Sequence, residues 1–203
     1  MAYVYDIFLS YKRHRESLRW LDEHFQPLLE YYVEEHAGER PKVFRDDQVI
    51  EAGDTWPTQL GTALGSSRVL VALWTKTYFH SHWCNRELAL MAARERSVGL
   101  RSAKRPHSLV IPVVLHDCND LPQGLAERQH VPMHDYFNVS MQRESSLREK
   151  LANLIDQKIA PAVVAAMRSA PRWKKTWKTD GADEMMSQFQ RLHAPSQKKV
   201  PRL

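Results

Sequence analysis

The chain has 203 residues, 43% hydrophobic and 26% charged, which is typical of a soluble globular protein with one α/β domain and an appendage. Its apolar runs are too short to span a membrane, and two cysteines exclude a disulfide framework. The histidines lack metal-ligand spacing, so we expect no metal site. The amino-terminal segment, with Asp6, does not resemble a secretory signal, so we expect a protein of the reducing cytoplasm.

The net charge of +5 is unevenly distributed along the chain. Residues 167–203 hold nine Lys or Arg and three Asp or Glu, so this segment carries +6 and the rest carries −1. We therefore predict a domain at residues 1–166 and a basic tail at residues 167–203, and we expect nucleic-acid binding through the tail or not at all. Trp173 and Trp177 in the tail could touch a membrane, a nucleic acid or a protein groove, or they could pack on the domain while the lysines reach solvent.

From the amino terminus, residues 3–11 form a nearly continuous β-branched and aromatic run, which is typical of a strand buried on both faces. This strand ends in the polar turn Ser10–Arg13. Apolar side chains at three- and four-residue spacing then predict an amphipathic helix from residue 18 to about Gly38. A short second strand at residues 41–44 and a polar loop at residues 45–54 follow.

The middle of the chain repeats this pattern. A helix that starts close to Pro57, where a missing N–H costs nothing, ends at about Gly65. A third strand, at residues 68–74, is again unalternating in its hydrophobicity. The next helix covers about residues 81–96.

The last third of the chain adds two strands and a helix. The fourth strand, at residues 109–115, contains Pro112, which we expect at an irregular or bulged position because a proline in a central strand loses a ladder hydrogen bond. A short fifth strand is expected at residues 130–133. A long final helix starts at about residue 147, and we expect Pro161 to mark a kink or an early end.

This alternation of strand and helix favours a parallel sheet with helices on both faces. We predict an α/β fold of the flavodoxin-like kind, with five parallel strands in the order 2-1-3-4-5 and a basic carboxyl-terminal extension. In this order, ligands bind where the first and third strands end, so the turn Ser10–Arg13 and residues 75–87 should meet there. Trp83 and Glu87 lie one helical turn apart in that segment. On spacing alone, however, a glutamate near the start of a helix is more often a solvated residue favoured by the helix dipole.

Three motifs, in this order and spacing, resemble those of the Toll/interleukin-1 receptor (TIR) domain family over about residues 3–160. The first is Y-D-I-F-L-S-Y-K-R in the first strand, and the second is R-D-D-Q-V-I-E-A-G in the loop that follows the second strand. The third is S-x-W-C-x-x-E-L, as in plant and bacterial members, and it contains Trp83 and Glu87. The basic tail at residues 167–203 is not covered by this resemblance.

The resemblance implies one of two activities. Some TIR domains only assemble with one another, whereas others cleave NAD⁺ between nicotinamide and ribose. In the cleaving members a catalytic glutamate stands at the position of Glu87, and Trp83 matches a residue that helps to line the site. Ser10 and Arg13 lie where family members contact nicotinamide and its ribose, although helix capping or a place in a surface turn would explain them as well.

Three further residues are candidates for substrate binding. Trp56 and Trp74 could stack on adenine, but aromatic residues of this kind more often pack in a core or an interface. Asp46 is expected to structure its loop rather than to take part in the chemistry.

One carboxylate is chemically sufficient for NAD⁺ cleavage. Nicotinamide leaves as a neutral molecule and needs no proton, so the carboxylate has only to orient the ribose hydroxyls and stabilise the developing positive charge. NAD⁺ is then the substrate, and no cofactor is expected.

The leading hypothesis is therefore an NAD⁺ nucleosidase that hydrolyses or cyclises its substrate and is activated by self-assembly. The chain resembles stand-alone microbial TIR proteins, including those of anti-phage defence systems such as Thoeris, in which a separate effector or regulatory subunit can respond to the product. A domain taken from a longer protein is equally compatible with the sequence. The alternative function is a non-catalytic scaffold that docks to like domains through residues 45–54.

Other enzyme classes fit the sequence less well. The chain has no G-x-G-x-x-G motif and no P-loop, which argues against a dehydrogenase or a kinase. A phosphoacceptor receiver domain needs an aspartate at the end of the third strand, where this chain has Trp74-Thr75-Lys76. A nucleoside deoxyribosyltransferase-like enzyme remains a distant alternative.

Overall fold

The computed structural model describes residues 2–45, 58–116, 125, 128–175 and 177. Two of the candidate residues, Asp46 and Trp56, lie outside these ranges, as does the start that the sequence predicts for the helix close to Pro57.

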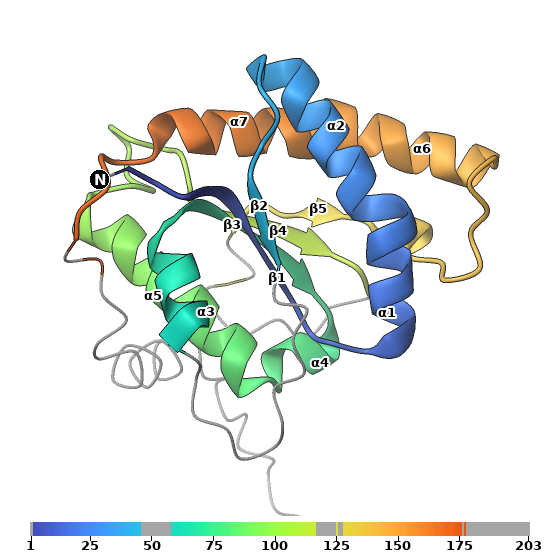
Figure 1. Ribbon diagram of the computed structural model, residues 1–203, viewed down its shortest axis with the longest axis horizontal. Helices are drawn as coiled ribbons and strands as arrows, with labels where there is room; N and C mark the ends of the chain where they lie inside the picture. Colours follow the sequence, from blue (N-terminus) through green and yellow to red (C-terminus); the bar gives the residue numbers. More distant parts are fainter. Residues whose placement is uncertain (1, 46–57, 117–124, 126–127, 176, 178–203) are drawn as a thin grey trace, which may run out of the picture.

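Five parallel strands form a single sheet in the order β2-β1-β3-β4-β5, which confirms the predicted order (Figure 1). The strands are β1 (Tyr5–Tyr11), β2 (Val43–Arg45), β3 (Ser67–Trp74), β4 (Val110–Val114) and β5 (Val131–Pro132). β1 and β3 pair from Tyr5 opposite Ser67 to Tyr11 opposite Leu73, so their carboxyl ends lie side by side. Both strands are buried through most of their length, which explains their unalternating sequences.

Helices cover both faces of the sheet. In Figure 1, α2, α6 and α7 lie above the sheet, and α3 and α5 lie below it. The first group consists of α1 (Arg15–Trp20), η1 (Leu21–Phe25), α2 (Gln26–Ala37), α6 (Ser146–Leu154), η3 (Ile155–Ile159) and α7 (Ala160–Ser169). The remaining helices are α3 (Thr58–Gly65), α4 (Lys76–Phe79), α5 (His82–Ser97) and the short 3₁₀ turn η2 (His134–Tyr136).

The predicted irregularity at Pro112 is wrong. β4 pairs with β3 without interruption from Leu70 opposite Val110 to Trp74 opposite Val114. The N–H of Leu115 donates to the carbonyl of Trp74, and because alternate residues of a strand face the same neighbour, the nitrogen of Pro112 faces away from β3. On that other side, β5 begins to pair only at position 113. The proline therefore removes no hydrogen bond from the β3–β4 ladder.

Pro161 also does not end its helix, which continues to Ser169. The π-helical segment η3 comes just before this proline, and such a wider turn accommodates a residue that cannot donate to the carbonyl four residues earlier. The first helix uses the same arrangement, because the π-helical segment η1 precedes Pro27. That helix ends at Gly38, whose φ of 82° is the left-handed conformation of a glycine cap.

The part of the tail that is described packs back on the domain. The ring of Trp177 stacks on Tyr3 at 5.8 Å between centroids, and the guanidinium carbon of Arg94 lies 4.6 Å from the Trp177 ring. The hydroxyl of Tyr3 donates to the carbonyl of Pro171 at 2.8 Å, so the tail lies against the amino terminus (Figure 1). For Trp177, packing on the domain is therefore the correct alternative. Among the helices that are described, none is long and apolar enough to cross a membrane.

Candidate active site

A cavity of about 150 Å³ opens at the carboxyl end of β1, against the start of α5. Three segments line this cavity, namely residues 8–13 of β1 and its turn, Leu60 of α3, and Ser81, Trp83, Cys84 and Glu87 at the start of α5. The turn Ser10–Arg13 and the pair Trp83 and Glu87 thus meet in one place, as the predicted topology requires. The volume is below the range of a pocket for a whole drug-sized ligand, so it suits one ring system.

A larger open groove, of about 1100 Å³, lies along β4 and α7. Basic and apolar residues line it, and its described lining contains no carboxylate. In the same part of the chain that the structure describes, no group of three or more His, Cys, Asp or Glu could hold a metal ion. The cavity at the end of β1 is therefore the candidate active site, because it lies at the switch point of the sheet order and holds a buried carboxylate beside an aromatic ring.

The start of α5 is fixed by a capping hydrogen bond. The Oγ of Ser81 accepts the backbone N–H of Cys84 at 3.4 Å, which satisfies one of the free donors at the start of a helix. This cap holds the first turn of α5 beside the end of β1. Trp83, which is half-buried, and Glu87 both reach the cavity from that turn and the next.

Glu87 is buried, with 6% of its surface exposed. Its Oε2 accepts a hydrogen bond from the Oγ of Ser10 at 2.6 Å, which joins α5 to the end of β1. A buried carboxyl group is costly unless it is hydrogen-bonded, and the hydrogen bond from Ser10 meets this requirement at one of its oxygens. Glu87 is therefore not a solvated residue at a helix start, which is the alternative that spacing alone had favoured.

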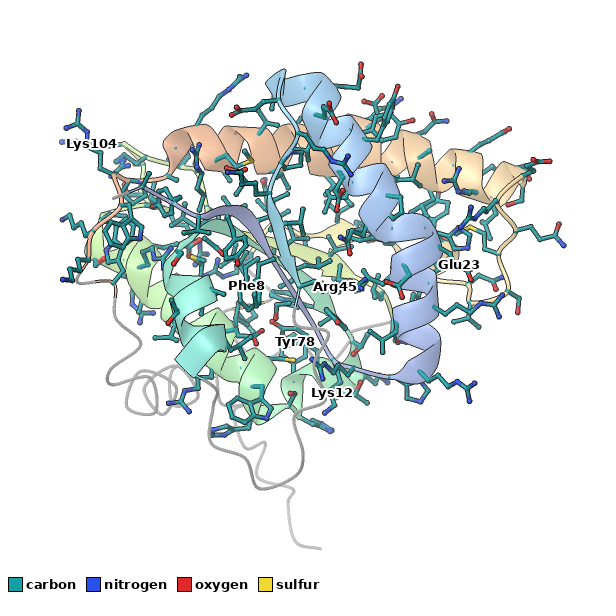
Figure 2. The ribbon with its side chains drawn as sticks, viewed as in Figure 1. Phe8, Lys12, Glu23, Arg45, Tyr78 and Lys104 are labelled. Atoms are coloured by element: carbon teal, nitrogen blue, oxygen red, sulfur yellow. The ribbon has the colours of Figure 1, made fainter. Side chains whose placement is uncertain are left out.

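Sequence reasoning missed Tyr78, which lies behind this pair on α4. Its Oη is 2.8 Å from the Oγ of Ser10 and donates to the carbonyl of Cys84 at 3.3 Å. Figure 2 shows Tyr78 at the lower end of the sheet, near Lys12. Burial raises the pKa of Tyr78 well above its usual value, so the hydroxyl stays protonated and can donate. The only signal in the sequence was that Tyr78 falls within residues 75–87, the segment expected at the crevice.

Two cations and a thiol complete the lining of the cavity. Lys12 is exposed and Arg13 is half-buried, and both lie at its mouth. The Sγ of Cys84 donates to the carbonyl of Tyr11 at 3.5 Å, and burial raises the pKa of this thiol well above its usual value. Cys84 is therefore a protonated structural residue rather than a nucleophile, because the thiolate is the reactive form.

Trp74 is not brought to the cavity. It is fully buried at the end of β3, where its ring meets that of Phe79 edge-to-face at 5.3 Å. This arrangement matches the core-packing alternative, and it leaves the indole inaccessible to an adenine. Of the seven candidate residues, the structure thus places Ser10, Arg13, Trp83 and Glu87 around one cavity.

The sheet order and the polar crevice between β1 and α5 define a flavodoxin-like α/β domain with a cavity at its topological switch point, where ligands bind in folds of this kind. The sequence profile of the TIR domain matches residues 7–152, most of the chain. The protein belongs to the TIR domain family, which confirms the resemblance seen in its motifs.

Two solved TIR structures are among those similar to this chain. The TIR domain of the Toll-related receptor TRR-2 from Hydra magnipapillata is 17% identical over 65% of this chain and 86% of that chain, with a TM-score of 0.44. The TIR domains of the activated Roq1 resistosome, which directly recognizes the pathogen effector XopQ, are 18% identical over 92% of this chain and 98% of that chain, with a TM-score of 0.37.

Proposed function

We propose that this TIR domain is an NAD⁺ nucleosidase in which Glu87 is the catalytic residue. The observation that carries the proposal is a buried carboxylate, held by Ser10 at 2.6 Å, in a cavity that Trp83 also lines. A titratable group that is buried, specifically bonded and open to a cavity is a candidate for function with a physical rationale. The family resemblance supports the choice of substrate, because the NAD⁺-cleaving members have a glutamate at this position.

The proposed chemistry needs few groups. The cavity receives the nicotinamide ring of NAD⁺ with the ribose beside Glu87, and the indole of Trp83 gives one flat wall against which a ring can pack. As the bond between nicotinamide and ribose lengthens, positive charge develops on the ribose. The carboxylate of Glu87 stabilises this charge and orients the ribose hydroxyls, while nicotinamide departs as a neutral molecule. Arg13 and Lys12 supply positive charge at the mouth for the rest of the substrate.

The fate of the ribosyl cation decides the product. Attack by water gives ADP-ribose, whereas attack by the adenine of the same molecule gives a cyclic product and needs water to be excluded. The proposal covers both outcomes. Self-assembly of TIR domains activates the enzyme. The biological setting is microbial defence against phage in the cytoplasm, where a separate effector or regulatory subunit responds to the product.

The test is an assay of NAD⁺ cleavage with and without clustering of the protein on a multivalent particle, with products identified by mass. Clustered wild-type protein is expected to release nicotinamide, and Glu87→Gln, which keeps the size of the side chain, is expected to release none. Glu35→Gln, a change at an exposed glutamate of α2, serves as the control and keeps full activity. Intact NAD⁺ in the clustered wild type would instead support the non-catalytic scaffold, and turnover by Glu87→Gln would remove Glu87 from its role.

A further inference from the structure

We propose that Tyr78 is a positioning residue for Glu87 and that it acts through the hydroxyl of Ser10. This inference rests on the proposed NAD⁺ cleavage, because it assigns a role within the same site. Tyr78 does not line the cavity, so it does not touch the substrate. It is instead the residue that determines which way the Ser10 proton points.

The direction of the hydrogen bonds follows from counting protons. Ser10 has one hydroxyl proton, and its contact of 2.6 Å with the Glu87 carboxylate uses that proton. The contact of 2.8 Å between Ser10 and Tyr78 must then be made by the proton of Tyr78. Tyr78 therefore donates to Ser10, and Ser10 donates to Glu87. The more distant carbonyl of Cys84, at 3.3 Å, shares the Tyr78 proton as a weaker acceptor.

The ring of Tyr78 is held firmly enough to orient Ser10. The side chain is fully buried, and its ring packs edge-to-face against Phe79 at 5.3 Å between centroids. Its own backbone N–H donates to the Oγ1 of Thr75 at 3.0 Å, which caps α4. The tyrosine hydroxyl thus has a fixed position relative to the end of β3, while Ser10 belongs to β1 and Glu87 to α5. Three elements of the fold converge on one carboxylate.

The two successive hydrogen bonds, from Tyr78 to Ser10 and from Ser10 to Glu87, restrict the orientation of the Glu87 carboxylate more than Ser10 would alone. The last torsion of a glutamate side chain is broad and roughly two-fold, so the carboxylate plane is poorly defined without an external contact. A serine hydroxyl can rotate, but one that already accepts a hydrogen bond from Tyr78 presents its proton in a defined direction. Successive hydrogen bonds in a buried environment also strengthen one another. Without the Tyr78 hydroxyl, Ser10 rotates more freely, and its hydrogen bond no longer holds Oε2 of Glu87 in one defined direction.

The experiment compares Tyr78→Phe, Ser10→Ala, the double variant and the control Tyr3→Phe, all clustered and assayed for NAD⁺ cleavage. Tyr3 is a matched control, because its hydroxyl also makes a bond of 2.8 Å, to Pro171, but at the other end of β1. We expect Tyr78→Phe to lower kcat about tenfold or more with KM changed by less than about twofold, since misorientation affects the reacting step. The double variant should be no slower than Ser10→Ala, because Tyr78 acts through Ser10. Tyr3→Phe should keep the wild-type kcat.

A second measurement does not depend on activity. In protein with ¹³C-labelled glutamate carboxyls, the Glu87 resonance is assigned by its loss in Glu87→Gln. Tyr78→Phe and Ser10→Ala should move this resonance at neutral pH, whereas Tyr3→Phe should leave it in place. If Tyr78→Phe does not fold, 3-fluorotyrosine placed at position 78 keeps the packing and makes a stronger donor, so it should also move the resonance.

The outcomes separate the two proposals. An inactive clustered wild type defeats the NAD⁺ cleavage, while the carboxyl resonance still tests the link from Tyr78 to Glu87. An active wild type with an unchanged kcat in Tyr78→Phe overturns the role of Tyr78 and leaves the enzyme in place. Additive losses in the double variant, or a resonance that does not move, would likewise show that Tyr78 does not act through Ser10.

Discussion

The two buried glutamates of α5 differ in their surroundings. Glu87, near the start of the helix, is bonded to Ser10 and lines a cavity. Glu95, about two turns further on, is 1% exposed, and its Oε2 lies 2.8 Å from the guanidinium of Arg128. Its Oε1 accepts the backbone N–H groups of Leu109 and Val110 at 2.7 and 3.1 Å. Glu95 therefore holds the start of β4 against α5, whereas Glu87 faces space that a ligand can fill.

The comparison shows that a buried charge by itself does not identify an active site. A carboxylate whose oxygens are taken up by a cation and by backbone donors has a structural role, and removing it leaves the partners buried and unsatisfied. A carboxylate in contact with a cavity can exchange partners when a substrate enters. The two residues are of the same type, on the same helix and similarly buried, so only their contacts distinguish them.

The first and largest predicted effect is on stability. Glu95→Gln should lower the free energy of unfolding by about 3–5 kcal/mol, because it leaves the guanidinium of Arg128 buried without its counter-charge. Glu87→Gln, the same chemical change, should lower it by less than Glu95→Gln does, since the amide oxygen can still accept from Ser10. Urea unfolding of the two variants beside the wild type measures both. Equal losses in the two variants would remove the distinction between a structural and a functional carboxylate.

The second prediction concerns the tail that covers the far end of α5. Trp177→Ala should cost about 2 kcal/mol of stability, the sum expected for a cation–π contact with Arg94 and a stacked pair with Tyr3. The cavity at the other end of α5 should be unaffected, so clustered NAD⁺ cleavage should not change. Lys174→Ala, at an exposed position, is the control for a change in the tail. An unaltered urea midpoint in Trp177→Ala would mean that the tail does not stabilise the domain.

The same tail packs closely on α3. A Cβ added at Gly65 would lie 2.9 Å from the backbone oxygen of Trp177, so Gly65→Ala should also displace the tail. Its loss of stability should be smaller once Trp177 has been replaced by Ala, because the two changes then act on the same contact.

The sequence was sufficient to predict the sheet and to predict that Ser10, Arg13, Trp83 and Glu87 lie close together, because both depend on local patterns. Buried parallel strands have continuous apolar sequences, and the switch point of the sheet order brings the end of β1 to the start of α5. Ser10 and Glu87 could therefore be placed together from their positions in the chain. Their hydrogen bond depends on side-chain geometry, which residue spacing does not contain.

Other features depend on contacts between distant parts of the chain. The role of Tyr78 requires its hydroxyl to meet Ser10, which lies 68 positions away in the sequence. The prediction for Pro112 failed because the pattern of one strand does not show where its neighbour β5 begins. That Pro161 lies within a continuous helix depends on the π-helical turn that precedes it, and no propensity rule specifies such a turn.

The smallest predicted effect tests whether the tail excludes water from the far end of α5, where Tyr3 packs against Trp177. Burial raises the pKa of Tyr3 to about 12, from 10.0. As the pH rises from about 10 to 12, the unfolded chain releases the Tyr3 proton while the folded protein keeps it, so the free energy of unfolding falls. The neighbouring Arg94, whose pKa burial lowers to about 10, acts in the opposite direction in this window, and its electrostatic coupling to Tyr3 keeps the expected difference between Tyr3→Phe and the wild type small.

Tyr3→Phe should therefore lose less stability than the wild type between about pH 10 and about pH 12, as measured by urea unfolding at each pH. The raised pKa of Tyr78 contributes equally to both proteins and cancels from their difference. Parallel pH dependences would mean that water reaches the Tyr3 hydroxyl, and that the tail covers this end of α5 less completely than the bond to Pro171 implies. A weaker pH dependence of the unfolding free energy in Tyr3→Phe would instead show that the tail shields the end of α5 beside Tyr3 from water. The start of the same helix, by contrast, lines a cavity that a ligand can enter.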